Sequence, residues 1–160
     1  RACMRLEYFQ LIDRIVELKL DEQSIRVQAR VPESSTIFEG HFPGLPLMPG
    51  VLLIESMAQT SGWLLIGLTQ FTRMPFFAAV KDAKLRSFVT PGQELIISAK
   101  LVHLGSGFAV SKAEIRSSEK LVANAEITFR LVEFPNPEFR TSMQQMASVI
   151  EFPATALANA

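Results

Sequence analysis

The sequence lacks the features that stabilise small secreted proteins or bind nucleic acids. Cys3 is the only cysteine among 160 residues, so no disulfide can form within the chain. Sixteen basic and sixteen acidic side chains cancel, whereas nucleic-acid-binding domains normally carry a basic excess. The first fifteen residues contain charged side chains and no apolar run typical of a secretory signal. We therefore expect a cytoplasmic protein without a nucleic-acid partner.

Metal ligands and membrane spans are equally scarce. The two histidines, His41 and His103, share no cluster with cysteine, so we expect neither a metal nor another cofactor. Residues 51–68 are apolar enough to suggest a membrane span. They fall at the short end of the ~20 residues that a span needs and include Glu55 and Gln59. A buried core helix is the better interpretation.

Apolar residues, in contrast, are plentiful enough for one packed core, at 48% of the sequence. We expect a single domain over residues 1–134 and a C-terminal extension over residues 135–160, because Pro135 and Pro137 end the last predicted strand. Apolar residues recur in this extension at helical spacing, at Phe139, Met143, Met146 and Ile150. The spacing predicts a short amphipathic helix followed by a loose tail, packed as an appendage on the sheet or on a neighbouring subunit.

One long helical segment stands among strand-like segments. The predicted strands are residues 14–20, 24–31, 75–85, 94–103, 108–116 and 121–132. The last two alternate apolar and polar residues, as in an antiparallel sheet with one dry and one wet face. The helix from Gly50 to about Leu68 is apolar on nearly every side, so it must be covered around most of its circumference. An antiparallel sheet curved around one helix meets this need, and the fold class is α+β.

A histidine and a glutamate near the start of this helix form a candidate acid–base pair. His41 lies in a loop that prolines stiffen, which fixes its position at low entropic cost. Glu55 lies inside the helix among apolar residues, where burial would raise its pKa and suit it to act as a general acid. The first N–H groups of the helix lack intrahelical partners and could bind an oxyanion. Residue types alone leave open that both side chains are only structural.

The segment around these residues, GHFPGLPLMPGVLLIESMAQTSG at positions 40–62, closely resembles the signature of bacterial β-hydroxyacyl-(acyl carrier protein) dehydratases, the FabZ family. The resemblance continues through residues 76–86 and 89–95 and covers roughly residues 6–132. It implies a hot-dog fold, in which an antiparallel sheet wraps a central helix, and a homodimer, with a trimer of dimers left open. It also implies the dehydration of (3R)-3-hydroxyacyl groups on acyl carrier protein to trans-2-enoyl groups in type II fatty acid biosynthesis.

The resemblance also assigns roles to individual residues. His41 matches the base that removes the α-proton, and Glu55 matches the acid that assists departure of the β-hydroxyl. The backbone amide of Gly50 matches the group that holds the thioester carbonyl, and Gln59 matches a glutamine that orients the acid. In that family the histidine and the acid of one site come from different subunits. The glutamate at position 55 favours the branch that only dehydrates over the branch that also isomerises the double bond.

The resembled family receives its acyl chain on the phosphopantetheine arm of acyl carrier protein, which is acidic. In a chain of zero net charge, only a local basic cluster can steer such a partner. The candidate docking residues are Arg73, Lys81, Lys84 and Arg86. Scattered solvated charges remain the alternative interpretation of these residues. Three other activities also stay open: hydration of enoyl-coenzyme A, thioester hydrolysis, and acyl binding without catalysis.

Overall fold

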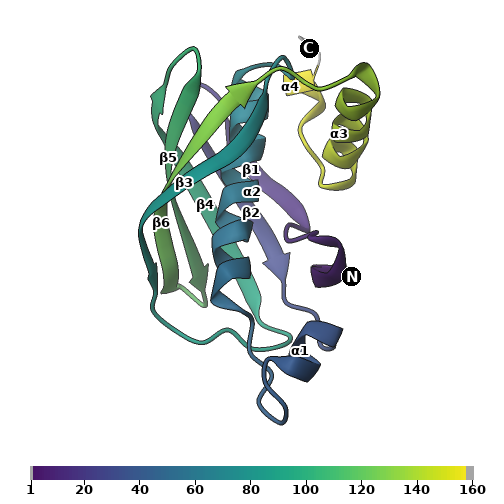
Figure 1. Cartoon of the computed structure of the whole chain (residues 1–160), viewed down its shortest axis with the longest axis vertical. Coiled ribbons are helices and arrows are strands. Elements are labelled where there is room, and N and C mark those ends of the chain that lie inside the picture. The colour runs from purple at the N-terminus through teal and green to yellow at the C-terminus, as the bar shows by residue number, and fades with distance from the viewer. Residues whose placement is uncertain (1, 158–160) are drawn as a thin grey trace.

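The computed structural model describes residues 2–157, in which six strands form one antiparallel sheet in the order β1-β2-β4-β5-β6-β3. The strands are β1 (Arg14–Lys19), β2 (Ser24–Arg30), β3 (Met74–Leu85), β4 (Glu94–Leu104), β5 (Phe108–Ser117) and β6 (Lys120–Val132). The sheet curves around the long helix α2 (Gly50–Leu68), as Figure 1 shows. The predicted α+β hot-dog arrangement is confirmed.

Local sequence explains how neighbouring strands join. Strands β5 and β6 turn through Ser118 and Glu119, both of which have positive φ, the geometry of a tight two-residue hairpin. Buried alanines then form a row across the middle of the sheet, because Ala113 of β5 lies opposite Ala99 of β4 and Ala125 of β6. Small side chains at these positions leave space for the helix to approach the sheet closely.

Helix α2 is the centre of the hydrophobic core. Its buried hydroxyls all have partners: Ser56 and Thr60 donate to helix carbonyls, and Ser61 accepts from Ser111 of β5 at 2.8 Å. The helix is long and apolar enough to cross a membrane, but 72% of its most apolar window is buried within the protein. The expectation of a buried core helix is confirmed.

Short helices flank this core at both ends of the chain. A single 3₁₀ turn, η1 (Leu6–Tyr8), and α1 (Thr36–Gly40) lie near the start of α2, while α3 (Pro137–Val149) and α4 (Ala154–Leu157) follow the last strand. Figure 1 shows α1 at the foot of α2 and α3 standing beside the upper part of α2. The end of the loose tail predicted from the sequence falls on residues 158–160, outside the described residues.

Helix α3 is attached to the domain at both of its ends. At its start, Asn136 caps the helix by accepting from the Phe139 amide at 2.7 Å, and Arg140 donates to the Phe71 carbonyl at 2.8 Å. At its end, the Ile15 amide of β1 donates to the Ile150 carbonyl at 2.8 Å. These contacts hold the helix in one position relative to α2.

Candidate functional site

The loop that carries His41 begins at a capped helix. Ser35 accepts from the Ile37 amide at the start of α1, and its hydroxyl donates to the Glu7 carboxylate at 2.6 Å. The Thr36 amide donates to the same carboxylate, and the Ser35 hydrogen bond is the largest cause that lowers the pKa of Glu7. Helix α1 ends where the His41 amide donates to the Ile37 carbonyl at 3.0 Å. The residues before His41 are thereby fixed to the N-terminal turn.

His41 itself is held through both its backbone and its ring. The Leu47 amide donates to the His41 carbonyl at 2.9 Å, and Nδ1 of His41 lies 2.9 Å from the Leu47 carbonyl oxygen. A carbonyl only accepts, so Nδ1 carries a proton, and in the neutral ring Nε2 is then the nitrogen with the lone pair. The ring also stacks on Phe42, with 4.1 Å between centroids. An imidazole held in this orientation presents Nε2 as the acceptor in its neutral form, which is the form that a general base needs.

The start of α2 leaves backbone donors available. The residue before the helix is Pro49, which provides no side-chain cap, and its carbonyl accepts from the amides of Leu52 and Leu53. Among the described residues, none accepts a hydrogen bond from the Gly50 amide. The side chain of Leu85 lies so close to Gly50 that a β-carbon there would collide with its Cδ1. Glycine therefore permits β3 to approach an amide that carries the positive end of the helix dipole.

Glu55 and Gln59 lie one above the other on α2 and are in contact. Gln59 Nε2 donates to Glu55 Oε1 at 3.3 Å and to the Phe9 carbonyl at 2.8 Å, while its Oε1 accepts from the Leu11 amide at 3.3 Å. One side chain thus orients the carboxylate and fastens the N-terminal segment to the helix. The Glu55–Gln59 contact implied by the resemblance is present.

Glu55 is less enclosed than the sequence suggests. Its neighbours Leu52, Leu53 and Met57 are buried, but Glu55 is only half-buried. The reason is the helix geometry, since residues adjacent in sequence point in different directions around the axis. The neighbouring apolar residues turn into the core, and the carboxylate turns toward a cavity.

This cavity has a volume of about 370 Å³ and lies between α2 and α3. Its other walls are residues 9–12, residues 74–77 at the start of β3, and Phe129 of β6. Glu55 and Gln59 line it, whereas His41 and Gly50 do not. Within the chain, the structure therefore brings Glu55 together with Gln59 and leaves His41 and Gly50 at the foot of the helix.

Sequence reasoning missed the contribution of α3, which it interpreted as an appendage. Phe139, Met143, Met146, Val149 and Ile150 all line the cavity. The helical spacing of these apolar residues was visible in the sequence. Which surface they faced was not, because that depends on where the chain returns after the last strand.

The basic residues proposed for carrier docking divide into two groups. Arg73 precedes β3 and forms an ion pair with Glu133 at 3.4 Å. Lys84 lies at the other end of the strand, roughly 35 Å away at ~3.3 Å per residue, and Arg86 follows it. Since Leu85 between them touches Gly50, the structure places Lys84 and Arg86 beside the start of α2 and leaves Arg73 apart.

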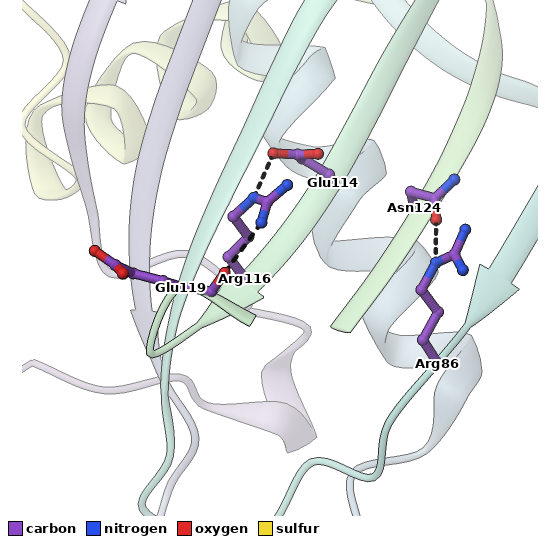
Figure 2. Close-up of polar contacts among 5 residues, drawn as sticks. All are labelled: Arg86, Glu114, Arg116, Glu119 and Asn124. Carbon is purple, nitrogen blue, oxygen red and sulfur yellow. Dashed lines mark hydrogen bonds and ion pairs between the residues drawn. The ribbon is translucent and has the colours of Figure 1, made fainter. Parts of the chain in front are cut away.

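The partners of these basic residues also differ. Lys81 lies opposite Glu126 on β6. Arg86 donates to the neutral amide of Asn124 at 2.8 Å, whereas the nearby Arg116 is paired with the Glu114 carboxylate at 2.9 Å (Figure 2). The positive charge of Arg86 is therefore less neutralised than that of Arg116.

The sequence matches the family model of the FabA-like domain over residues 4–126. The chain belongs to this family. Two curated relatives of this FabA-like protein are the 3-hydroxyacyl-[acyl-carrier-protein] dehydratases FabZ of Symbiobacterium thermophilum and Fusobacterium nucleatum. The first is 35% identical over 131 residues, which cover 81% of this chain and 92% of the relative. The second is 36% identical over 126 residues, which cover 78% and 88%. The resemblance to the dehydratases is confirmed.

Solved structures with the same fold belong to proteins of differing description. A conserved protein from Pseudomonas aeruginosa aligns with a TM-score of 0.62 and 25% identity, covering 79% of this chain and 91% of that one. A dehydratase heterocomplex from Xenorhabdus doucetiae gives 0.63 and 17%, covering 85% and 90%. A hypothetical thioesterase with coenzyme A from Streptococcus pneumoniae gives 0.60 and 19%, covering 77% and 88%. The fold alone therefore does not select the reaction.

The three hydrogen bonds of Gln59 generate a first prediction. Replacing Gln59→Ala should lower the free energy of unfolding by about 1–3 kcal/mol, because the buried Leu11 amide loses its acceptor. Exchange of the Leu11 amide hydrogen should accelerate roughly tenfold, as expected for the loss of one hydrogen bond. Gln145→Ala, at an exposed position of α3, is the matched control. If the Leu11 amide hydrogen exchanges equally slowly in the Gln59→Ala variant, the hydrogen bond from Leu11 to Gln59 does not stabilise the N-terminal segment.

Proposed function

We propose that this protein dehydrates (3R)-3-hydroxyacyl groups on acyl carrier protein to trans-2-enoyl groups, as a cytoplasmic enzyme of type II fatty acid synthesis. The observation that carries the proposal is the match to curated dehydratases over most of both chains, within a family match at residues 4–126 that includes His41, Gly50, Glu55 and Gln59. The orientation of the His41 ring supports it independently, because Nδ1 bonds to the Leu47 carbonyl and the neutral ring would accept a proton at Nε2.

Each of these groups has one role in the proposed reaction. The Gly50 amide holds the thioester carbonyl and stabilises the negative charge that develops on its oxygen. Nε2 of His41 takes the α-proton, the electron pair of that C–H bond forms the double bond, and the β-carbon–oxygen bond breaks. Glu55 gives its proton to the departing hydroxyl, which leaves as water. Transfer of the proton from His41 to Glu55 then restores both groups.

A site of this kind requires His41 to reach the cavity that Glu55 lines, and we propose that a second copy of the chain supplies it. The outer edge of β3 has no partner strand among the described residues, and it exposes Phe76, Val80 and Leu85. A long unpaired edge with exposed apolar side chains favours pairing with another strand. A two-fold homodimer through β3 would satisfy this edge and combine His41 of one subunit with Glu55 of the other.

The role of His41 gives the direct test of the function. His41→Ala should reduce kcat by at least a hundredfold, since general base catalysis typically contributes ~10²–10⁴, while the circular dichroism spectrum stays unchanged. The assay follows the absorbance of the enoyl product from a 3-hydroxyacyl thioester. His103→Ala is the control, because His103 is exposed and stacks on Phe108. Near-normal turnover by folded His41→Ala protein would show that His41 is not the general base.

The shared site predicts rescue between two inactive variants. When His41→Ala and Glu55→Ala chains assemble at random, about half of the dimers are mixed, and each mixed dimer holds one intact site. Activity should then return to about a quarter of the wild-type value, provided the sites are independent. Mixed dimers purified through two different tags provide the measurement. If they are inactive, the two residues of a site do not come from different subunits.

Docking of the carrier is a separate part of the proposal. Acyl carrier protein is acidic, and Lys84 and Arg86 lie exposed beside the start of α2, where the thioester would enter. Lys81, earlier in β3, is also exposed and adds positive charge, although the acidic Glu126 lies opposite it on β6. Arg73, at the far end of β3, would contact the carrier only if the carrier spans the whole strand. We therefore assign the main electrostatic contact to Lys84 and Arg86.

Charge reversal tests this assignment. Lys84→Glu with Arg86→Glu should raise KM for a carrier-bound substrate, more strongly at low salt, because opposite charges steer the encounter. The effect on a small pantetheine thioester should be much weaker. Reversal of Arg14 and Lys19, exposed on β1 at the opposite edge of the sheet, changes the net charge equally and is the control. An equal rise for both substrates, or for the control variant, would contradict the docking site.

A further inference from the structure

Two helices present matching faces to the cavity. The residues of α2 that line it include Glu55, Gln59, Gly62 and Ile66, and those of α3 include Phe139, Met143, Met146 and Val149. In both sets the residues recur every three or four positions, which places each set along one face of a helix. At 1.5 Å per residue, each face is about 15 Å long. The cavity therefore has a helix face of similar length on two of its sides.

The polarity of these walls changes from one end to the other. On α2, Glu55 and Gln59 are polar, and the wall beyond them consists of Gly62, Trp63 and Ile66. The start of α3 marks the apolar end, because Arg140 bonds to Phe71, which lies just beyond the C-terminus of α2. An occupant that fits this space is reactive or polar at one end and apolar along the rest.

Helix α3 is firmly held, yet its side toward the cavity is incompletely packed. Ala147, Ile150 and Phe152 are buried and join the hydrophobic core. In contrast, Phe139 keeps 38% of its surface exposed and Met146 keeps 47%. Apolar side chains on a fixed helix that face an unfilled apolar space have the character of a binding surface, and methionine adapts readily to ligand shape.

We propose that the acyl chain of the substrate lies between α2 and α3, with the reacting carbons at Glu55, and that Phe139 and Met143 limit the length of chain that fits. This inference rests on the proposed function and deepens it by naming the substrate class. The apolar part of the cavity, at Gly62, Trp63 and Ile66, lies beyond Glu55 and Gln59, so the substrate class is an acyl chain long enough to reach it. The selecting helix lies outside the family match at residues 4–126.

A larger side chain at the cavity tests the proposal in the full chain. Met143→Trp should lower the ratio of kcat/KM for 3-hydroxydodecanoyl over 3-hydroxybutyryl thioester at least tenfold, because the larger side chain occupies the space of the longer acyl chain. Gln145→Trp places the same side chain on the exposed face of α3 and should keep the wild-type ratio. An unchanged ratio in folded Met143→Trp protein would overturn the proposal.

Trp63 offers a second measurement on the unmodified protein. It is the only tryptophan in the sequence, it is 6% exposed, and it lines the cavity about 12 Å along α2 from Glu55. Titration with dodecanoyl-pantetheine, which lacks the hydroxyl and cannot react, should change its fluorescence, whereas butyryl-pantetheine should not. No change with the longer chain, or equal changes with both, would overturn the proposal that the acyl chain binds in this cavity.

The two measurements separate this inference from the function on which it rests. If the wild-type protein turns over no 3-hydroxyacyl thioester but Trp63 responds only to the long chain, the dehydratase proposal fails and the proposal of acyl binding in the cavity holds. If turnover is normal, but Met143→Trp keeps the wild-type ratio and the Trp63 fluorescence does not depend on chain length, acyl binding in the cavity is contradicted and the dehydratase proposal holds.

Discussion

The burial of α2 within the curved sheet determines where every other part of the molecule can act. The sheet covers the sides of the helix that carry Leu53, Met57 and Leu64, and the Ser111–Ser61 hydrogen bond fixes its rotation. The row from Glu55 to Ile66 faces the cavity instead. That row and the first turn of the helix are the parts of α2 on which the proposed chemistry depends.

Much of this arrangement could be predicted from residue patterns. A helix that is apolar all round requires a cover, and the alternation in β5 and β6 shows what the cover is. The position of His41 in a stiff loop and of Glu55 on the helix also followed from local sequence. The position of β3 did not. It pairs with β6 at the far side of the sheet from β2, a long-range choice that no local turn encodes.

The details of the site depended on contacts between distant segments. The Leu47 carbonyl that fixes the proton on His41 Nδ1 becomes available only when the loop closes on itself. The cavity beside Glu55 depends on α3, which begins some eighty residues later and leaves this space instead of packing tightly. The basic residues show the same limitation, since Arg73 and Lys84 are close in sequence but separated by an extended strand.

The cavity walls come from segments far apart in the sequence, which implies an order of assembly during synthesis. Residues 9–12 are synthesised before α2, so the Leu11 amide lacks its acceptor until Gln59 emerges. The opposite wall arrives last, with α3. A nascent chain that has already enclosed α2 in its sheet therefore still presents an open apolar trough. Helix α3 closes it, so this apolar surface is most exposed to aggregation or to chaperone binding before α3 emerges.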